Sequence, residues 1–354
     1  MIRRNYILLT LFLLVAGLCI FQYSRRTCEY RSDQFLMDTL VSIKAYGTNA
    51  GTVKNAVDAA YVEMHRIAEL ADGFPKPGTA AWNSSDVCRI NEQAGIKPVT
   101  VHKDVIAMVT LARKYFELSN GAFDVTIDPV MDQWGFGGEN PHIPPPGALG
   151  TALALVDSRN LLIDEQARTV FLRTKGMKLD LGAVAKGYAT EKAAEVLTRH
   201  GITKALIDAG GNIRVLGRNV RDTPWKIGIK DPRKSEAIIA VVSMENAAAV
   251  TSGDYYRHFE SGGKRYHHIL DPRTGYPANQ NMSATVVTRD AGLADVLSTV
   301  FFVLSPEKAL EMAGRIPGVE LFLVTADGQI RHSPALNSRL EIKEGSAYHY
   351  DPSR

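Results

Sequence analysis

The feature that most constrains the fold is a succession of strand-like apolar runs joined by glycine-rich turns. They occupy most of residues 156–182 and 204–272. Helical spacing of apolar residues is confined to a few long segments: 50–73, 103–121, 183–200 and 294–316. Strands that follow one another through short turns pair antiparallel, whereas a doubly wound sheet needs a helix after nearly every strand. We therefore predict an α+β fold with a largely antiparallel mixed sheet and packed helices.

Composition adds limits on partners. The chain has 354 residues and a formal net charge of only +3, with Lys and Arg scattered among Asp and Glu. It contains no basic stripe with interleaved aromatic residues, so nucleic acid is excluded as the expected partner. We expect FPKPGTAAWNSSD (74–86) to be a loop, GENPHIPPPGALG (138–150) to be a surface excursion, and FLMDTLVSIKAYG (35–47) to be one strand.

The N-terminus carries an uncharged run from Tyr6 to Tyr23, flanked on both sides by paired arginines. Its length lies between that of a signal-peptide core and that of a membrane-spanning helix. No small-x-small cleavage site follows, which favours an uncleaved anchor with the rest of the chain exported. A lipoprotein modified at Cys19, or a cleaved signal, is the alternative, although Leu18 is larger than the residue that normally precedes a lipidated cysteine.

These observations divide the chain into an anchor and polar tether (1–33), a main domain (34–340) and a C-terminal tail (341–354). Cys28 and Cys88 follow no zinc or C-x-x-C spacing, so we expect free thiols.

Two stretches have the character of a phosphate site. In LDLGAVAKGYATEKAAEVL (179–197) a strand ends at Asp180, and a helix begins whose first turn holds Lys186. Free N–H groups, the helix dipole and a lysine at a helix start favour an anion, although a plain strand-to-helix turn gives the same pattern. In LIDAGGNIRVLG (206–217), Gly210 and Gly211 either let the backbone approach a ligand or form a hairpin turn.

A third stretch, GLADVLSTVFFVL (292–304), has the character of a metal site. Asp295 and Thr299 are four residues apart on a predicted helix and share a face, with Ser298 beside them. A carboxylate and two hydroxyls are hard oxygen ligands suited to Mg²⁺. Alternatively, Thr299 bonds a backbone carbonyl one turn back and Asp295 caps the helix.

Aromatic residues gather in GAFDVTIDPVMDQWGFG (121–137), where they are either core or the walls of a flat ligand site. With two residues from elsewhere, they could sandwich a heterocycle: Met37, Trp82, Phe123, Trp134 and Phe136.

A fifth stretch, HHILDPRTGYPA (267–278), places two histidines before a turn. Side chains alternate along a strand, so His267 and His268 face opposite sides, and we expect one to face solvent. Pro272 and Gly275 set the turn, which Asp271 is expected to cap.

Five motifs in this order, DLGAVAKGYA, DAGGN, VTSGDY, HHILDPRTG and ADVLSTVFF, resemble those of the ApbE family of FAD:protein FMN transferases. The resemblance covers about residues 34–330. It implies an ApbE-like, T-fold-related architecture and transfer of FMN from FAD onto a threonine hydroxyl of a target protein, with release of AMP and with Mg²⁺ at the pyrophosphate.

The resemblance also implies roles for particular residues. His268 would be the general base, because an imidazole can accept the proton of a threonine hydroxyl as it attacks phosphorus. The metal would be held by the Ala183 carbonyl with Asp295, Ser298 and Thr299. FAD would be contacted by Met37, Trp82, Ala122, Phe123, Asp124, Asp180, Lys186 and Ile269. Near Trp82 the chain departs from the family, since WNSSDVCRIN lacks the acidic-proline part of the motif.

Alternative functions are Mg²⁺-dependent hydrolysis of FAD to FMN and AMP, and an exported flavin-binding protein without turnover. For the transferase we expect the bacterial inner membrane, with the catalytic domain facing the periplasm or exterior. Its acceptor would be a subunit of a membrane redox complex.

The anchor hypothesis predicts the mass of the mature protein. If Tyr6–Tyr23 is an uncleaved anchor, the purified protein retains its N-terminus and leaves the membrane only when detergent is added. Intact-mass measurement of protein extracted from membranes checks this. A mass that begins at Cys19 with added acyl chains would establish the lipoprotein instead.

Overall fold

The structure is a computed structural model that describes residues 27–75, 77–136, 138, 140–234, 236–343 and 347–350. The predicted anchor and Cys19 lie outside these residues. Within the described ranges, no helix has the length and hydropathy needed to cross a bilayer. Cys28 and Cys88 are free thiols, as predicted.

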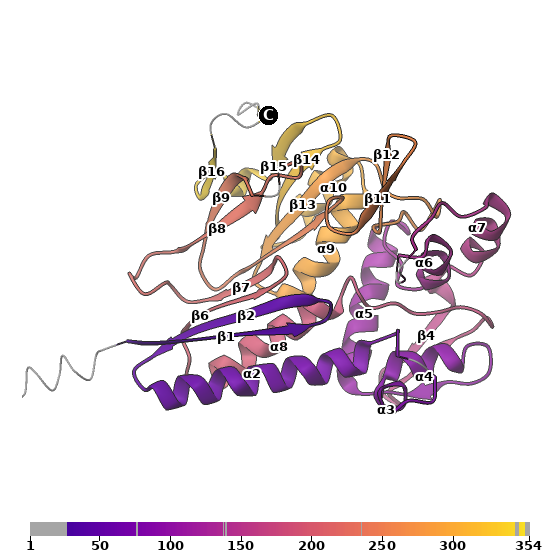
Figure 1. Cartoon of the computed structure of the whole chain (residues 1–354), viewed down its shortest axis with the longest axis horizontal. Helices are drawn as coiled ribbons and strands as arrows, with labels where there is room; N and C mark the ends of the chain where they lie inside the picture. Colours follow the sequence, from indigo (N-terminus) through magenta and orange to yellow (C-terminus); the bar gives the residue numbers. More distant parts are fainter. Residues whose placement is uncertain are drawn as a thin grey trace, which may run out of the picture.

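A nine-stranded sheet forms the middle of the molecule (Figure 1). All of its neighbouring strands pair antiparallel except β15 and β17, which are parallel. The prediction of an α+β fold with a largely antiparallel mixed sheet is confirmed. In spatial order the strands are β1 (Cys28–Leu36), β2 (Thr39–Gly47), β6 (Lys204–Ala209), β7 (Asn212–Leu216), β10 (Ala248–Gly253), β13 (Asn281–Thr288), β14 (Glu320–Thr325), β15 (Gln329–His332) and β17 (His349–Tyr350).

Helices pack against one face of this sheet. α2 lies on β1 and β2, α8 on β6 and β7, α9 on β10 and β13, and α10 on β14. All four coincide with the segments of helical periodicity, as does α5, which packs against α2 and α9. Their bounds are α2 (Ala50–Ala71), α5 (Lys103–Leu118), α8 (Ala185–Arg199), α9 (Ala291–Val303) and α10 (Pro306–Arg315).

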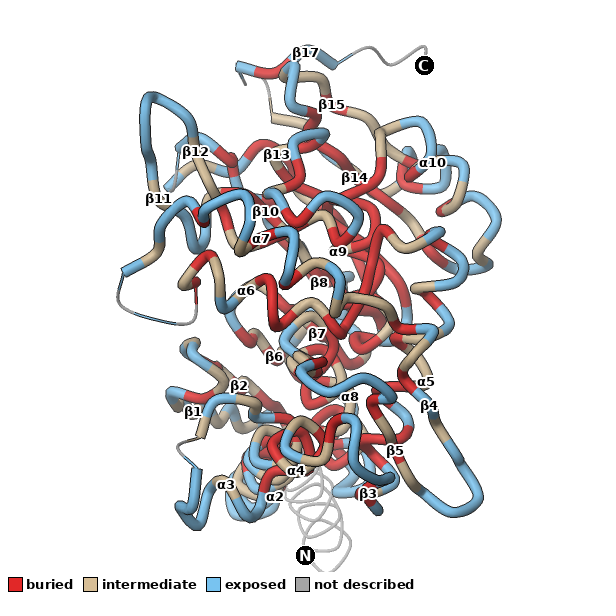
Figure 2. Tube along the Cα trace, turned by 90° about the vertical axis from the view of Figure 1, so that its right-hand side faces the viewer, coloured by how far each residue is buried: buried red, intermediate tan, exposed pale blue. Residues whose placement is uncertain are grey.

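A three-stranded sheet covers part of the other face, in the order β16 (Leu340–Ile342), β9 (Ile238–Met244) and β8 (Trp225–Lys230). The central strands are therefore buried on both sides. In β14, Leu321 and Leu323 belong to the core under the helices, whereas Phe322 and Val324 belong to the core under the small sheet. This explains why the strand is continuously apolar, and why red, buried residues fill the middle of Figure 2.

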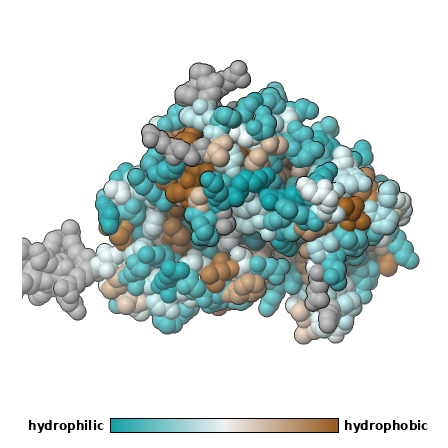
Figure 3. Space-filling model, turned by 45° about the horizontal axis from the view of Figure 1, so that its top comes forward, coloured by the Kyte–Doolittle hydropathy of each residue, from teal (hydrophilic) through white to brown (hydrophobic). Residues whose placement is uncertain are grey.

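Smaller elements surround these layers. They are α3 (Ala80–Ser84), α4 (Asp86–Glu92), β3 (Val99–Thr100), α6 (Asp128–Trp134), α7 (Pro146–Leu153), β4 (Leu161–Asp164), β5 (Thr169–Leu172), β11 (His258–Ser261), β12 (Lys264–His267) and two 3₁₀ turns (Ser158–Asn160, Pro334–Leu336). In the view of Figure 3, hydrophilic and apolar residues are interspersed over the surface.

The N-terminal boundary drawn from the sequence is corrected. Residues 28–36 are not a tether but strand β1, which pairs with β2 along its whole length. The segment read as one strand is therefore a hairpin whose turn residues, Met37 and Asp38, both have positive φ (54° and 58°). β1 is an edge strand with alternate residues exposed, so its sequence looks polar.

Two predicted irregular segments also contain helices. The stretch read as a loop at 74–86 includes α3 and the start of α4, whose N-caps are Thr79 and Ser85. The stretch at 138–150 includes the first turn of α7.

The C-terminal boundary at 340/341 falls within β16, and in the following segment Tyr348 donates a hydrogen bond from its hydroxyl to Asp231 (2.6 Å).

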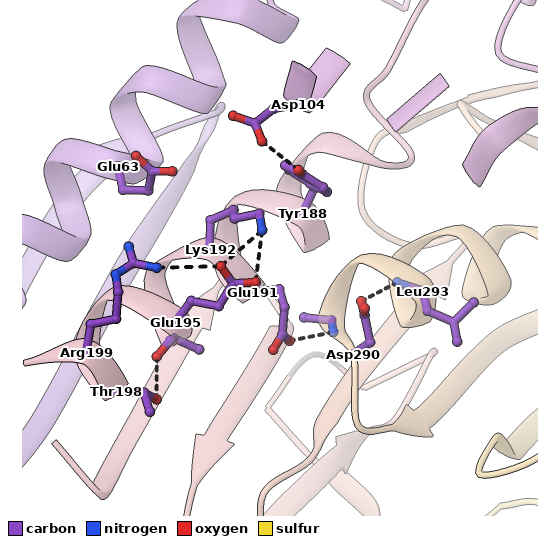
Figure 4. Close-up of polar contacts among 12 residues, drawn as sticks. Glu63, Asp104, Tyr188, Glu191, Lys192, Glu195, Thr198, Arg199, Asp290 and Leu293 are labelled. Atoms are coloured by element: carbon purple, nitrogen blue, oxygen red, sulfur yellow. Dashed lines mark hydrogen bonds and ion pairs between the residues drawn. The ribbon is translucent and has the colours of Figure 1, made fainter. Parts of the chain in front are cut away.

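A close crossing of α8 and α9 positions the cavity described below. At this crossing Gly187 is so near α9 that a Cβ would lie 2.2 Å from the carbonyl oxygen of Ala291. Polar contacts hold the two helices in place (Figure 4). Glu191 of α8 accepts from the backbone N–H of Ala291 (2.9 Å), and Asp290 caps α9 through the N–H of Leu293 (2.8 Å). The α8 residue Tyr188 donates to Asp104 of α5 (2.7 Å).

The crossing predicts that replacing two helical glycines by alanine changes the free energy of unfolding by very different amounts. Gly187→Ala should lower the free energy of unfolding by roughly 1–3 kcal/mol or more, because the added methyl group overpacks the crossing. Gly314→Ala in α10 is the control, since a Cβ there meets nothing within 4 Å. It should be neutral or stabilising by about 1 kcal/mol. Urea denaturation of both variants measures the difference, and equal stabilities would show that α8 and α9 can separate without loss.

Candidate functional site

One cavity of about 720 Å³ lies between the tip of the β1–β2 hairpin and helix α6. Its volume is in the range of sites that bind small molecules and cofactors. Its walls come from segments far apart in sequence, namely 35–39, 65–74, 122–136, 180–186, 210–212, 250–257, 268–272 and 295–299.

Most of the residues predicted from the sequence line this cavity. Trp82 does not: it lies half-buried on α3. Ser298 is fully buried just behind the wall. The predicted residues that line the cavity are Met37, Ala122, Phe123, Asp124, Asp180, Ala183, Lys186, His268, Ile269, Asp295 and Thr299.

The start of α8 has the geometry expected of an anion site. No side chain caps this helix at its N-terminal residue, Val184. The ammonium of Lys186 donates to the carbonyl of Gly182 (3.0 Å), and the carboxylate of Asp180 accepts from the N–H of the same glycine (2.7 Å). The loop thus holds a positive charge and a helix N-terminus toward the cavity, which favours a phosphate.

Oxygen ligands gather beside it on α9. Asp295 is 5 % exposed, and its Oδ2 accepts from the N–H of Gly187 (2.7 Å). Burial raises the pKa of Asp295, although the charge of Lys186 and the Gly187 N–H oppose this. Asp295 is not the cap of α9, since Asp290 occupies that position.

Hydroxyl groups complete this cluster. The Oγ of Ser252 on β10 lies 2.8 Å from the Oγ of Ser298 and 3.3 Å from the Oγ1 of Thr299. Thr299 therefore points to the cavity side. Among the described residues, no group of three His, Cys, Asp or Glu side chains could hold a metal ion. One carboxylate with hydroxyls fits a hard cation that takes its other ligands from substrate phosphates.

His268 lines the same cavity, directly after strand β12. Its Nδ1 lies 3.2 Å from the carbonyl oxygen of Arg257. Because a carbonyl only accepts, Nδ1 carries the proton and Nε2 keeps a free lone pair. Burial, reinforced by the charge of Arg257, lowers the pKa of His268 to about 3, so the ring is neutral at pH 7.

His267 corrects the expectation that one histidine faces solvent. It is buried, with Nε2 2.8 Å from the carbonyl of Ala278 and Nδ1 accepting from the N–H of Ile269 (3.3 Å). Its ring meets Phe302 edge-on, with centroids 5.4 Å apart. His267 therefore holds the following turn in place, the structural role that a buried histidine most often has.

The turn itself is built as predicted. Asp271 accepts from the N–H of Arg273 (2.9 Å) and pairs with its guanidinium group (2.7 Å). Gly275 has a φ of 74° and donates its N–H to the carbonyl of Asp271 (2.8 Å). Asp271 is not a wall residue of the main cavity, and it caps the turn as expected.

The chain is similar to several known proteins. The sequence profile of the ApbE family matches residues 37–323. The FAD:protein FMN transferase of Treponema pallidum is 32% identical over 332 residues, which cover 90% of this chain and 90% of that protein. The enzyme of that name from Klebsiella pneumoniae is 36% identical over 267 residues, 75% of this chain and 83% of that protein. The crystal structure of the ApbE protein of Thermotoga maritima has a TM-score of 0.80 at 32% identity and covers 88% of this chain and 99% of that one.

The chain belongs to the ApbE family. Its profile match and the Treponema relative, which aligns over nearly the whole length of both proteins, decide this.

The aromatic residues of this ApbE chain divide between wall and core. Phe123 and Phe136 line the cavity. Trp134 is fully buried, stacks on Phe136 at 5.9 Å and donates from Nε1 to the carbonyl of Gly275 (2.8 Å). It supports both a wall residue and the turn. Asp124 accepts from Thr126 and from Ser158, so its carboxylate braces the wall from behind.

Sequence reasoning missed several wall residues. Asn212 in the DAGGN turn is 2 % exposed and lines the cavity, and neither atom of its amide has a hydrogen-bond partner among the described residues. The sequence left open a backbone approach to a ligand or a hairpin turn there. The structure has the hairpin turn between β6 and β7, with Gly210 at a φ of 65°, and Gly210 also lines the cavity. Ser252 lies within the VTSGDY motif, and Arg257 lies two residues after it. Asp128 lies in the aromatic stretch, four residues after Asp124.

Proposed function

We propose that this protein transfers FMN from FAD to a threonine hydroxyl of a target protein, forming a phosphoester and releasing AMP. The relatives named FAD:protein FMN transferase support this proposal. The observation that carries it is the placement of neutral His268 in one cavity with the start of α8 and the oxygen cluster around Asp295.

The start of α8 would bind the pyrophosphate of FAD. Lys186 and the uncapped N-terminus provide positive charge where the two phosphates need it. Phe123, Phe136 and Met37 are wall residues that can contact flat rings. A dinucleotide then lies with its phosphates at the centre of the cavity and a ring on either side.

His268 would act as the general base. As the threonine oxygen forms a bond to the phosphorus of the FMN moiety, its proton passes to Nε2, and the bond from that phosphorus to the AMP oxygen breaks. The Arg257 carbonyl, which holds Nδ1–H, stabilises the imidazolium that forms. A pKa of about 3 describes the cavity without substrate. The negative charge of bound phosphates raises it toward the range useful for catalysis.

The oxygen cluster fits Mg²⁺. The ion would be held by Asp295, Thr299, Ser298 and the Ala183 carbonyl. When bound, the ion would neutralise charge on the pyrophosphate oxygens. The N–H of Gly187 keeps the Asp295 carboxylate oriented toward that position.

Two other functions use part of the same site. Hydrolysis of FAD needs the same base with water as the nucleophile, so only an acceptor assay separates it from transfer. A flavin-binding protein without turnover does not require a neutral histidine and a cluster of oxygen ligands in one cavity. The site therefore favours an enzyme.

We also propose that the enzyme is held at the bacterial inner membrane by the Tyr6–Tyr23 segment and faces the periplasm or exterior. The apolar run and its flanking arginines support this location. Its acceptor would be an exported subunit of a membrane redox complex.

The proposed function predicts a covalent product that depends on His268. Wild-type protein incubated with FAD, Mg²⁺ and a threonine-bearing acceptor should increase the acceptor mass by FMN. His268→Ala should bind FAD nearly as well but transfer FMN roughly 10² to 10⁴ times more slowly, the usual loss on removing a general base.

The control is His200→Ala, an exposed histidine at the C-terminal end of α8 that does not line the cavity; it should transfer at the wild-type rate. Release of free FMN with no labelled acceptor would establish hydrolysis instead. Normal transfer by His268→Ala would eliminate the histidine as the base.

A second prediction concerns the metal. Asp295→Ala removes the carboxylate from the oxygen cluster and should lower the transfer rate at least about 10²-fold, in the range for losing preorganised charge stabilisation. EDTA should abolish transfer by the wild type, and added Mg²⁺ should restore it. Asp290→Ala, which removes only the cap of α9, should lose stability but keep its Mg²⁺ dependence. Full transfer in EDTA would contradict the metal role.

A further inference from the structure

Asp128 is a buried carboxyl group that the proposed mechanism does not use. It begins helix α6 and lines the cavity, with only 6 % of its surface exposed. Its Oδ1 has no hydrogen-bond partner among the described residues. A buried polar oxygen without a partner is unfavourable, so a bound group that supplies the missing hydrogen bond is favoured.

Burial and the charged groups around Asp128 disfavour its ionised form. Asp180, in the loop before α8, and Asp132, on α6 itself, both repel a negative charge there. Lys178 gives little compensation, because its ammonium is paired with Asp132 (2.5 Å). Burial, with this repulsion, raises the pKa of Asp128 to about 7. Near neutral pH a large fraction of the side chain is therefore a carboxylic acid with an O–H to donate.

The wall around Asp128 is suited to a ring and not to a phosphate. Four apolar residues line the same cavity. Met131 lies on α6 and Phe136 just after it, whereas Leu270 and Pro272 lie in the turn after His268. The carboxylate of Asp132 on the same helix would repel a phosphate, whereas Lys186 attracts one at the start of α8.

We propose that Asp128, as a neutral carboxylic acid, forms a paired hydrogen bond with the edge of one heteroaromatic ring of the dinucleotide. A carboxylic acid has an O–H donor beside a carbonyl acceptor. It can therefore pair with a ring edge that has an acceptor beside an N–H donor. Adenine presents such an edge at its amino group and ring nitrogen, and isoalloxazine presents one at its imide. The inference rests on the proposed binding of FAD and adds a ring-recognition residue to it.

Binding of FAD, FMN and ADP to three variants tests this inference. Fluorescence titration measures the two flavins, and calorimetry measures ADP. Asp128→Leu, which has neither donor nor acceptor, should weaken FAD binding about 10-fold. Asp128→Asn keeps a donor beside an acceptor and should bind almost as the wild type does. Gln133→Leu is the matched control on the same helix, since Gln133 does not line the cavity, and it should change affinity little.

The pH dependence separates hydrogen bonding from packing. The acid form persists below a pKa of about 7 and is lost above it, so wild-type affinity should fall as pH rises from 6 to 8.5. Asp128→Asn cannot ionise, and its affinity should stay level over that range. A purely structural role for Asp128 would leave the two pH profiles parallel, and that result would overturn the inference.

The three ligands show which ring pairs with Asp128, and they distinguish failure of this inference from failure of the proposed function. A loss by Asp128→Leu with ADP but not FMN assigns the pair to adenine, and the reverse assigns it to the flavin. Equal affinities of Asp128→Leu and wild type for all three probes would refute the inference while leaving FMN transfer intact. Failure of the wild type to bind FAD would instead refute the proposed function. Thermal unfolding of each variant confirms that it is folded.

Discussion

The site depends on the crossing of α8 and α9, where a backbone N–H meets a buried carboxylate. Gly187 lets the two helices approach until its N–H donates to Asp295 at 2.7 Å. Any larger residue would place its Cβ 2.2 Å from the Ala291 carbonyl oxygen. The same contact fixes the start of α8, with Lys186, beside the oxygen cluster of α9. The proposed anion site and the proposed metal ligands are therefore held together by one contact, and neither can shift without the other.

The two-sided burial of the sheet makes this crossing rigid. Helices α8 and α9 rest on strands that are packed on their other face by a second sheet, so the core resists local adjustment. β10 and α9 are neighbours on this support, which is why Ser252 and Ser298 meet at 2.8 Å although they are 46 residues apart. The edge hairpin β1–β2 closes the cavity from the opposite side with the strained turn at Met37.

Electrostatic asymmetry then divides the cavity. Lys186 and the start of α8 favour an anion in one region, where we propose that the phosphates bind. Around Asp128 the crowded carboxylates favour a neutral acid, which suits an uncharged ring edge. At His268, which lines the cavity, burial lowers the pKa, so the imidazole is neutral. Each of these states comes from burial and from neighbours brought together by the fold, since none of the three residues is unusual in isolation.

The sequence by itself determined the α+β class, the long helices and the motifs that supply most of the cavity wall, because periodicity and turn residues are local properties of the chain. Local pattern also paired Asp295 with Thr299 on one helix face. Only the tertiary structure decided that β1 belongs to the sheet, since an exposed edge strand looks like a polar tether. It alone placed Trp82 outside the wall and buried His267 beneath the turn. It also left the Asn212 amide and the Asp128 Oδ1 without hydrogen-bond partners within the described part of the chain. Such outcomes depend on contacts between segments far apart in the chain, and those contacts leave no periodic signal in the sequence.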